Sequence, residues 1–441
     1  MRTKKTSPFS RVINNTLIIT IGRVINALCS FIFIPWTTAS IGITEFGQLV
    51  LLMAFISSSA KITSLQAGQT LVHYGSAPFH KQDALTFRQI LAFCIRLECL
   101  SGIMGMFVGW IGIIFFGNFI FKGQLELYSL AYYCLFIIPF INATWQVGVI
   151  QLVNKYYLFV PVQALSTTIR TLGCFIGYEN HLRMSYFLAV WCITQLTDFI
   201  VLTILGIYLT RNQFNISSLW KTLFFPSTPV KGIWNFALFT TINNFIFSCS
   251  GQIFTLIVSA IVSTADLAIL SVARQIVSTA FRLSSLIGNN LYPELTKLRD
   301  DKNWHTLRRT LLKTFYFLGS LAVILILVTS TFGRYILSFM LSYHAPTDSI
   351  TLLNILAVAY IIAMASMPLN LLLTLFNNLS YITKAKSLVF TIWCIPLLLW
   401  LTHAFGINGA AAADGCEEFA IFLLYIYKAT RIINSLPIHK K

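Results

Sequence analysis

The sequence predicts an all-α membrane protein that crosses the bilayer about twelve times. Its 441 residues are 56% hydrophobic and 10% charged, and the mean hydropathy is +0.76. Soluble domains carry about 25% charged residues, so this chain lacks the polar surface that a water-soluble fold needs. Its apolar residues also form runs of about 20 residues, the length that spans the hydrocarbon core of a bilayer.

The first apolar run follows basic residues and has no small-residue cleavage site, so we expect it to stay as the first membrane helix. Each later run gives one further crossing. The predicted spans are 14–36, 46–67, 91–117, 128–150, 158–178, 185–208, 235–259, 267–290, 313–333, 349–371, 385–404 and 408–428.

Lysine and arginine are distributed very unevenly over the loops between these spans. If the N-terminus is cytoplasmic, the opposite face keeps only Lys122, Arg183 and Arg334 among the loop cations. The positive-inside rule therefore predicts a multi-pass protein with both termini in the cytoplasm. The formal net charge of +17 then reflects loops that meet anionic lipid, and no nucleic-acid partner is implied.

A hydrophilic stretch near residues 210–232 divides the spans into two sets of six. Aligning Glu45 with Asp266 also aligns Lys61 with Arg282, which suggests an internal repeat. Repeats with an even number of helices are parallel, and such transporters hold substrate between their halves and alternate access by rocking. We expect an N-terminal lobe (1–210), a cytoplasmic linker (211–232) and a C-terminal lobe (233–441) around a central cavity.

Several cations lie inside the spans, where each costs at least about 2.5–3.5 kcal/mol. We expect Arg96 to reach the interface and Arg170 to be able to pair with Asp198. The neighbouring segments offer no excess of acids for the others, so an anionic ligand in a water-filled cavity is expected to neutralise them. These candidate diphosphate-binding residues are Arg23, Lys61, Arg274 and Arg282.

Other polar residues in the spans suggest sugar binding and ion coupling. Asn243, Asn244 and Gln252 could bind hydroxyl groups. Glu98 and Asp198 could carry a coupling H⁺, with Na⁺ as the alternative, although ion pairs with Arg96 and Arg170 would explain them equally well.

Catalysis and metal binding find no support in the sequence. The nine cysteines form no CxxC motif and the seven histidines no HExxH motif, so we expect free thiols, no metal site, no cofactor and no enzymatic activity.

Four motifs resemble those of bacterial polysaccharide-export flippases in the multidrug/oligosaccharidyl-lipid/polysaccharide (MOP) superfamily. They are "GRVINALCSFIFIPW" (22–36), "IGITEFGQL" (41–49), "YPELTKLRDDKNWHTLRR" (292–309) and "GINGAAAADG" (406–415). The resemblance implies two six-helix bundles around a cavity in the bacterial inner membrane. It also implies transfer of an undecaprenyl-diphosphate-linked oligosaccharide, most commonly an O-antigen repeat unit for lipopolysaccharide, to the periplasmic leaflet.

In related lipid II flippases, cavity cations on helices one, two and eight are important, and the resemblance carries that role to Arg23, Lys61, Arg274 and Arg282. It further implies a monomer that works beside a polysaccharide polymerase. The chain departs from the family pattern at Gln252, where an acid is common, and in the acidic cluster of its last span.

Three alternatives stay open. A lipid II flippase would share the fold and the cations, whereas a multidrug antiporter would need an acidic cavity for cationic drugs. A polytopic glycan polymerase or ligase would need a large periplasmic loop, and the longest candidate, 331–349, is short and partly apolar.

Overall fold

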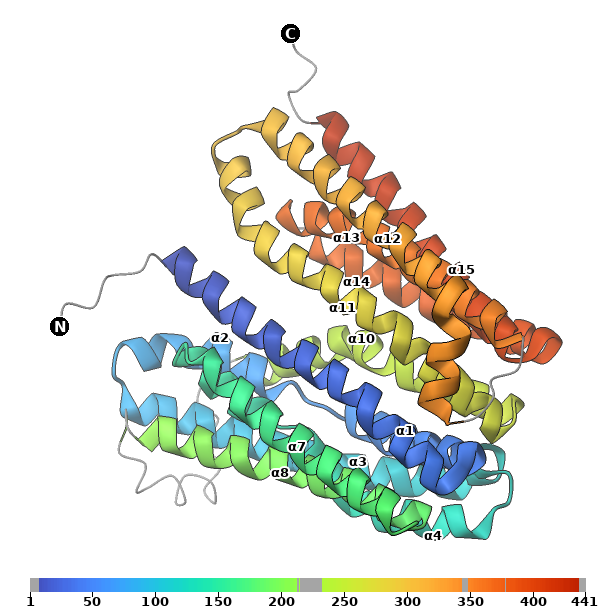
Figure 1. Ribbon diagram of the computed structural model, residues 1–441. Coiled ribbons are helices and arrows are strands. Elements are labelled where there is room, and N and C mark those ends of the chain that lie inside the picture. Colours follow the sequence, from blue (N-terminus) through green and yellow to red (C-terminus); the bar gives the residue numbers. More distant parts are fainter. Residues whose placement is uncertain (1–7, 212–213, 215–231, 343–347, 377, 436–441) are drawn as a thin grey trace. The chain divides into compact units, whose positions relative to one another are not determined.

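The computed structural model describes residues 8–211, 214, 232–342, 348–376 and 378–435, and these parts of the chain contain helices and no strand. The first half holds α1 (Pro8–Ile62), α2 (Ala67–His80), α3 (Ala84–Phe121), α4 (Leu125–Cys134), η1 (Leu135–Ile137), α5 (Ile138–Ile141), α6 (Thr144–Leu152), η2 (Tyr156–Leu158), α7 (Phe159–Glu179) and α8 (Met184–Arg211). The second half holds α10 (Ile233–Ile261), α11 (Thr264–Asp300), α12 (Trp304–Leu341), α13 (Asp348–Leu375), α14 (Leu379–Leu388), η3 (Val389–Cys394) and α15 (Ile395–Ser435) (Figure 1).

The predicted fold class is confirmed. Eight helical stretches of the described chain are long and apolar enough to cross a membrane. Of the two longest, Leu379–Ile433 holds two predicted spans, and Phe31–His80 holds the span 46–67 and the end of the span 14–36. Large apolar side chains on α3, such as Phe115 and Phe116, point outward. Lipid can solvate such an apolar surface, so the chain is a multi-pass membrane protein.

Two glycines separate predicted spans inside what is otherwise continuous helix. Gly42 in α1 has φ 77° and ψ 169°, and Gly406 in α15 has φ 59° and ψ −138°. Glycine adopts positive φ without the steric cost of a Cβ. Each glycine therefore lets one membrane helix end and the next begin with almost no loop.

Two spans that the sequence predicts as continuous are broken, which corrects the prediction. The span 46–67 stops at Ile62, and after Gln66 (φ 40°, ψ 42°) the chain resumes as α2. The span 128–150 is interrupted by η1 and again by non-helical backbone at Asn142 and Ala143. Apolar composition hides these breaks, because hydropathy measures the side chains and not the backbone.

The residues in contact group into two compact units, which are 1–47 with 257–441, and 48–256. In the first unit, Thr38 Oγ1 donates to the Met340 carbonyl (3.0 Å) and Ser342 Oγ donates to the Pro35 carbonyl (3.0 Å). These bonds join α1 to the end of α12. The division into lobes at 211–232 stays a prediction, and most of that linker lies outside the described residues.

Candidate functional site

The two helix breaks of the unit formed by residues 48–256 lie against each other. Asn142 Nδ2, in the second break, donates to the Ala60 carbonyl at the end of α1 (2.9 Å). Ser101 Oγ on α3 donates to the Thr63 carbonyl in the first break (2.7 Å). Carbonyls freed by a break inside a membrane need such partners, because lipid offers none.

The helices that follow the two breaks also approach closely. A Cβ atom on Gly68 in α2 would lie 2.2 Å from the Thr144 carbonyl oxygen in α6, so only glycine fits there. The short helices α2 and α6, each of which follows a break, are thus packed backbone to backbone.

Glu98 on α3 binds the start of α6. Its Oε2 atom accepts hydrogen bonds from Thr144 N (2.7 Å), Thr144 Oγ1 (2.5 Å) and Trp145 N (3.0 Å). The side chain is only 6% exposed. The first N–H groups of a helix lack partners within the helix, and its N-terminus carries partial positive charge. Glu98 therefore satisfies the broken end of α6.

These contacts bear on the ion pair between Glu98 and Arg96 that the sequence left open. Its hydrogen bonds go to α6, and no ion pair with Arg96 occurs within the described residues; the Arg96 Nη1 atom is itself buried with no hydrogen-bond partner there. Lys61, one of the expected diphosphate-binding residues, is partly buried in the last turn of α1, immediately before the first break.

At the contact between α7 and α8, Asp198 is bonded to a hydroxyl group, and its pairing with Arg170 stays a prediction. Asp198 on α8 accepts a hydrogen bond from Ser166 Oγ on α7. Arg170 lies one helical turn further along α7, and its side chain is partly buried. The Asp198 carboxylate thus lies at the α7–α8 interface, with a hydroxyl group as its hydrogen-bond donor.

In the unit formed by residues 1–47 and 257–441, Arg274 on α11 forms an ion pair with Asp414 on α15, at 3.3 Å between Nη2 and Oδ2. The side chains are 21% and 13% exposed. Tyr360, Glu417 and Glu418 lie near the pair. The expectation that Arg274 has no acid to neutralise it is therefore wrong. The sequence shows Asp414, but nothing in the sequence places it beside α11.

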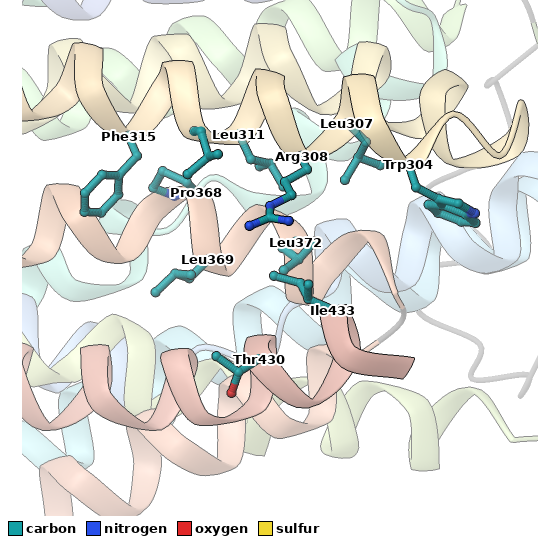
Figure 2. Close-up of a pocket in the computed structure, with 11 residues that line it drawn as sticks. Trp304, Leu307, Arg308, Leu311, Phe315, Pro368, Leu369, Leu372, Thr430 and Ile433 are labelled. Atoms are coloured by element: carbon teal, nitrogen blue, oxygen red, sulfur yellow. The ribbon is translucent and has the colours of Figure 1, made fainter. Parts of the chain in front are cut away.

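The same unit contains an apolar pocket of about 340 Å³ between α12, α13 and α15 (Figure 2). Leu307, Phe315 and Leu369 are among its apolar lining residues, and the exposed Arg308 side chain borders it. The pocket can accommodate a hydrocarbon chain with an anionic group near the arginine.

The helices that carry four of the predicted site residues are described, but the side chains of these four residues lie outside the described part of the structure. They are Arg23 on α1, Arg282 on α11, and Asn243 and Asn244 on α10. Gln252 is partly buried on α10. Within the described residues, no group of three or more His, Cys, Asp or Glu side chains could hold a metal ion.

The chain is similar to one protein family and to several solved structures. The family model named MatE matches residues 240–406. A structure described as an inward-facing multidrug resistance MATE family transporter of the MOP superfamily aligns with a TM-score of 0.72 and 12% identity, covering 98% of this chain and 100% of that one. The chain has the MATE fold.

Two further proteins are similar to this MATE-fold chain. The lipid II flippase MurJ, in an inward closed conformation, aligns with a TM-score of 0.69 and 15% identity, covering 94% of this chain and 87% of that one. The inner membrane protein YghQ of Escherichia coli (strain K12) is 22% identical over 300 residues, which is 67% of this chain and 84% of YghQ.

Proposed function

We propose that this protein is a transporter, not an enzyme, and that it moves an undecaprenyl-diphosphate-linked oligosaccharide from the cytoplasmic to the periplasmic leaflet of a bacterial inner membrane. The MATE fold supports transport by alternating access, since the aligned structures include a multidrug transporter and a lipid II flippase. The observation that carries the choice of substrate is the set of cations within the predicted spans.

In this proposal the cations bind the diphosphate. Charge-assisted hydrogen bonds to phosphate oxygens are among the strongest polar contacts, and Arg23, Lys61 and Arg282 would supply them. Arg274 is shared with Asp414, so it would hold the diphosphate only in competition with that carboxylate. Asn243, Asn244 and Gln252 would bind the sugars, and O-antigen is the substrate that we favour.

Two alternatives within the same fold have support from the aligned structures. A lipid II flippase would use the same cations, and its loss would be lethal rather than limited to a surface glycan. A multidrug antiporter would be favoured by acidic residues in the membrane, and the cluster of Asp414, Glu417 and Glu418 is of that kind. A polymerase partner, a monomeric state and cytoplasmic termini are further parts of the proposal.

The test is complementation of a strain that lacks its O-antigen flippase. The protein should restore surface polysaccharide, and Arg23→Ala together with Lys61→Ala should abolish it while the protein still inserts into the membrane. Lys122→Ala, at the end of α3, is the matched control because its side chain is exposed outside the spans. Normal surface polysaccharide in the double variant would refute the proposed role of the cations.

A further inference from the structure

The pocket between α12, α13 and α15 has an apolar wall and lies wholly within one of the two compact units. Apart from Arg308, Thr430 and the indole N–H of Trp304, the side chains that line it are apolar. Thr430 Oγ1 already donates a hydrogen bond to the Tyr427 carbonyl (3.0 Å). In a pocket of this kind the apolar wall holds the ligand and the few polar groups fix its orientation. Arg308 is therefore the group that would orient a ligand.

The pocket runs along α12, with Trp304 and Phe315 at its two ends and Arg308 between them (Figure 2). Arg308 lies about 8 Å along the helix before the predicted span 313–333 begins, whereas Phe315 lies inside that span. Trp304 stacks on Phe376, with ring centroids 6.2 Å apart. Tryptophan is typical of the level of the lipid headgroups. Arg308 is thus expected among the headgroups, and the deeper part of the pocket among the hydrocarbon chains.

Positive charge gathers at this end of the three helices, and acidic residues are missing there. α12 contains no Asp or Glu, α13 has only Asp348 at its other end, and α15 has none after Glu418. This excess of positive charge is complementary to an anion. The basic residues at this end are Arg308, Arg309 and Lys313 on α12, and Lys428 and Arg431 on α15.

Other arginines at this end of the unit have partners in the protein. Arg431 lies over the Tyr427 ring, at 4.6 Å from its centroid. Arg299, at the end of α11, forms an ion pair with Asp300 (2.8 Å). The exposed Arg308 side chain forms no ion pair within the described residues. Its counter-ion is therefore expected to come from outside the protein.

We propose that this pocket binds an anionic glycerophospholipid, with the lipid phosphate on Arg308 and one acyl chain along the wall toward Phe315. Arginine can donate two parallel hydrogen bonds to a phosphate group. Basic pockets between membrane helices on the cytoplasmic side are typical sites for anionic headgroups, and the predicted orientation places Arg308 on that side. The lipid stays in the pocket and is not transported, so this inference is independent of the proposed function.

Photo-crosslinking of the full-length protein in phosphatidylcholine nanodiscs tests the site. The probe is a trace of phosphatidylglycerol that carries a diazirine in one acyl chain, and peptide mass spectrometry locates its adducts. They should map to the pocket-lining segments 307–315 and 368–372. Excess unlabelled phosphatidylglycerol should remove them, whereas inorganic phosphate should not. A phosphatidylcholine probe with the same diazirine should label these segments much less.

Substitutions separate the two parts of the site. Arg308→Ala should reduce labelling by the phosphatidylglycerol probe about fivefold, the effect expected of one basic residue near an anionic membrane surface. Arg309→Ala is the matched control, because it removes an equally exposed charge from the same turn of α12 but does not line the pocket. Thr430→Trp fills the pocket from an exposed position and should abolish labelling inside it, although Arg308 is unchanged.

Each remaining outcome would overturn the proposal or part of it. Equal labelling by the two probes, or adducts spread over the whole lipid-facing surface, would exclude an anionic-lipid site. Equal losses in Arg308→Ala and Arg309→Ala would exclude Arg308 as the specific phosphate ligand. Displacement by inorganic phosphate would show that no acyl chain is needed. Displacement by undecaprenyl phosphate but not by phosphatidylglycerol would assign the pocket to a prenyl carrier.

The labelling experiment and the complementation experiment can fail separately. Labelling needs no oligosaccharide, so its failure would leave the proposed flippase function intact. Failed complementation together with labelling that depends on Arg308 would refute the flippase and keep the lipid site. Thr430→Trp gives a second readout should Arg308→Ala fail to fold.

Discussion

Arg274 and Asp414 form an ion pair although 140 residues separate them, and the pair joins α11 to α15 in a membrane-spanning unit. Both side chains are largely buried. Removing one member of a buried pair leaves an uncompensated charge, whereas replacing both with apolar groups can be neutral. This relationship leads to the first prediction.

Asp414→Ala or Arg274→Ala should lower the free energy of unfolding by about 3–5 kcal/mol. The double variant Arg274→Met with Asp414→Leu should recover most of that loss, because neither member of the pair is then left facing an absent partner. Thermal unfolding in detergent, followed by circular dichroism, measures the difference. Equal losses in the single and double variants would show that the pair is not coupled.

Gly47 supports a second prediction, on backbone contact. A Cβ atom at Gly47 would lie 1.8 Å from the Thr264 carbonyl oxygen, at the start of α11. Gly47→Ala should therefore force α1 and α11 apart and lower the melting temperature strongly. Gly251→Ala is the control, since nothing lies within 4 Å of that position and alanine favours helix. Similar melting temperatures for both variants would contradict the contact.

Asn142 allows a third prediction about the helix breaks. Its amide donates to the Ala60 carbonyl, which has left the helical ladder. Asn142→Ala should cost about 0.5–1.5 kcal/mol, the net contribution of one hydrogen bond, because the Ala60 carbonyl keeps a longer bond from Thr63 Oγ1 (3.4 Å). Asn180→Ala removes a side-chain bond to the Ile176 carbonyl at an exposed site, and it should cost little. Chemical unfolding of the two variants in parallel compares the costs.

The fourth prediction concerns pH and the loop before α3. Asp83 caps α3 by accepting a hydrogen bond from Thr86 N (3.2 Å), and its hydrogen bonds with Thr86 lower the pKa of the exposed carboxyl group below its usual value. A lowered pKa in the folded state means that the ionised cap stabilises the fold above the unfolded pKa. That stabilisation is lost as the pH falls through the folded pKa.

Asp83→Ala should accordingly lower the melting temperature slightly at neutral pH and make no difference in strong acid. Asp83→Asn retains a capping oxygen. Its melting temperature at neutral pH should lie between those of the unchanged protein and of Asp83→Ala, and residue 83 should then add no pH dependence. A deficit in Asp83→Ala that is the same at every pH would rule out the ionised cap.

The sequence alone predicted much of this fold because the bilayer constrains it. Hydropathy predicted many membrane helices, since a helix must satisfy its backbone polar groups before it can cross lipid, and eight stretches of the described chain are long and apolar enough to do so. Glycine at positions 42 and 406 lies where the predicted spans meet, and the structure has a kink with non-helical backbone at each of them. These features are local, because they depend only on residues close together in the sequence and on the surrounding lipid.

Other features depended on contacts distant in sequence. The sequence offered Glu98 as a proton carrier or an ion pair, and the structure shows it bound to α6 beyond a break that hydropathy could not reveal. Pro139 and Asn142 were the available signals of that break, since proline removes a helix donor. Arg274 likewise needed tertiary packing to meet Asp414.

The sequence by itself determined that the chain is helical, crosses the membrane many times and carries cations at depth. Tertiary structure decided that Arg274 is neutralised by Asp414, because pairing depends on distances between helices that are remote along the chain. A charge inside a membrane is costly wherever it lies, so the sequence alone reveals it. Its partners can be identified only from the three-dimensional structure.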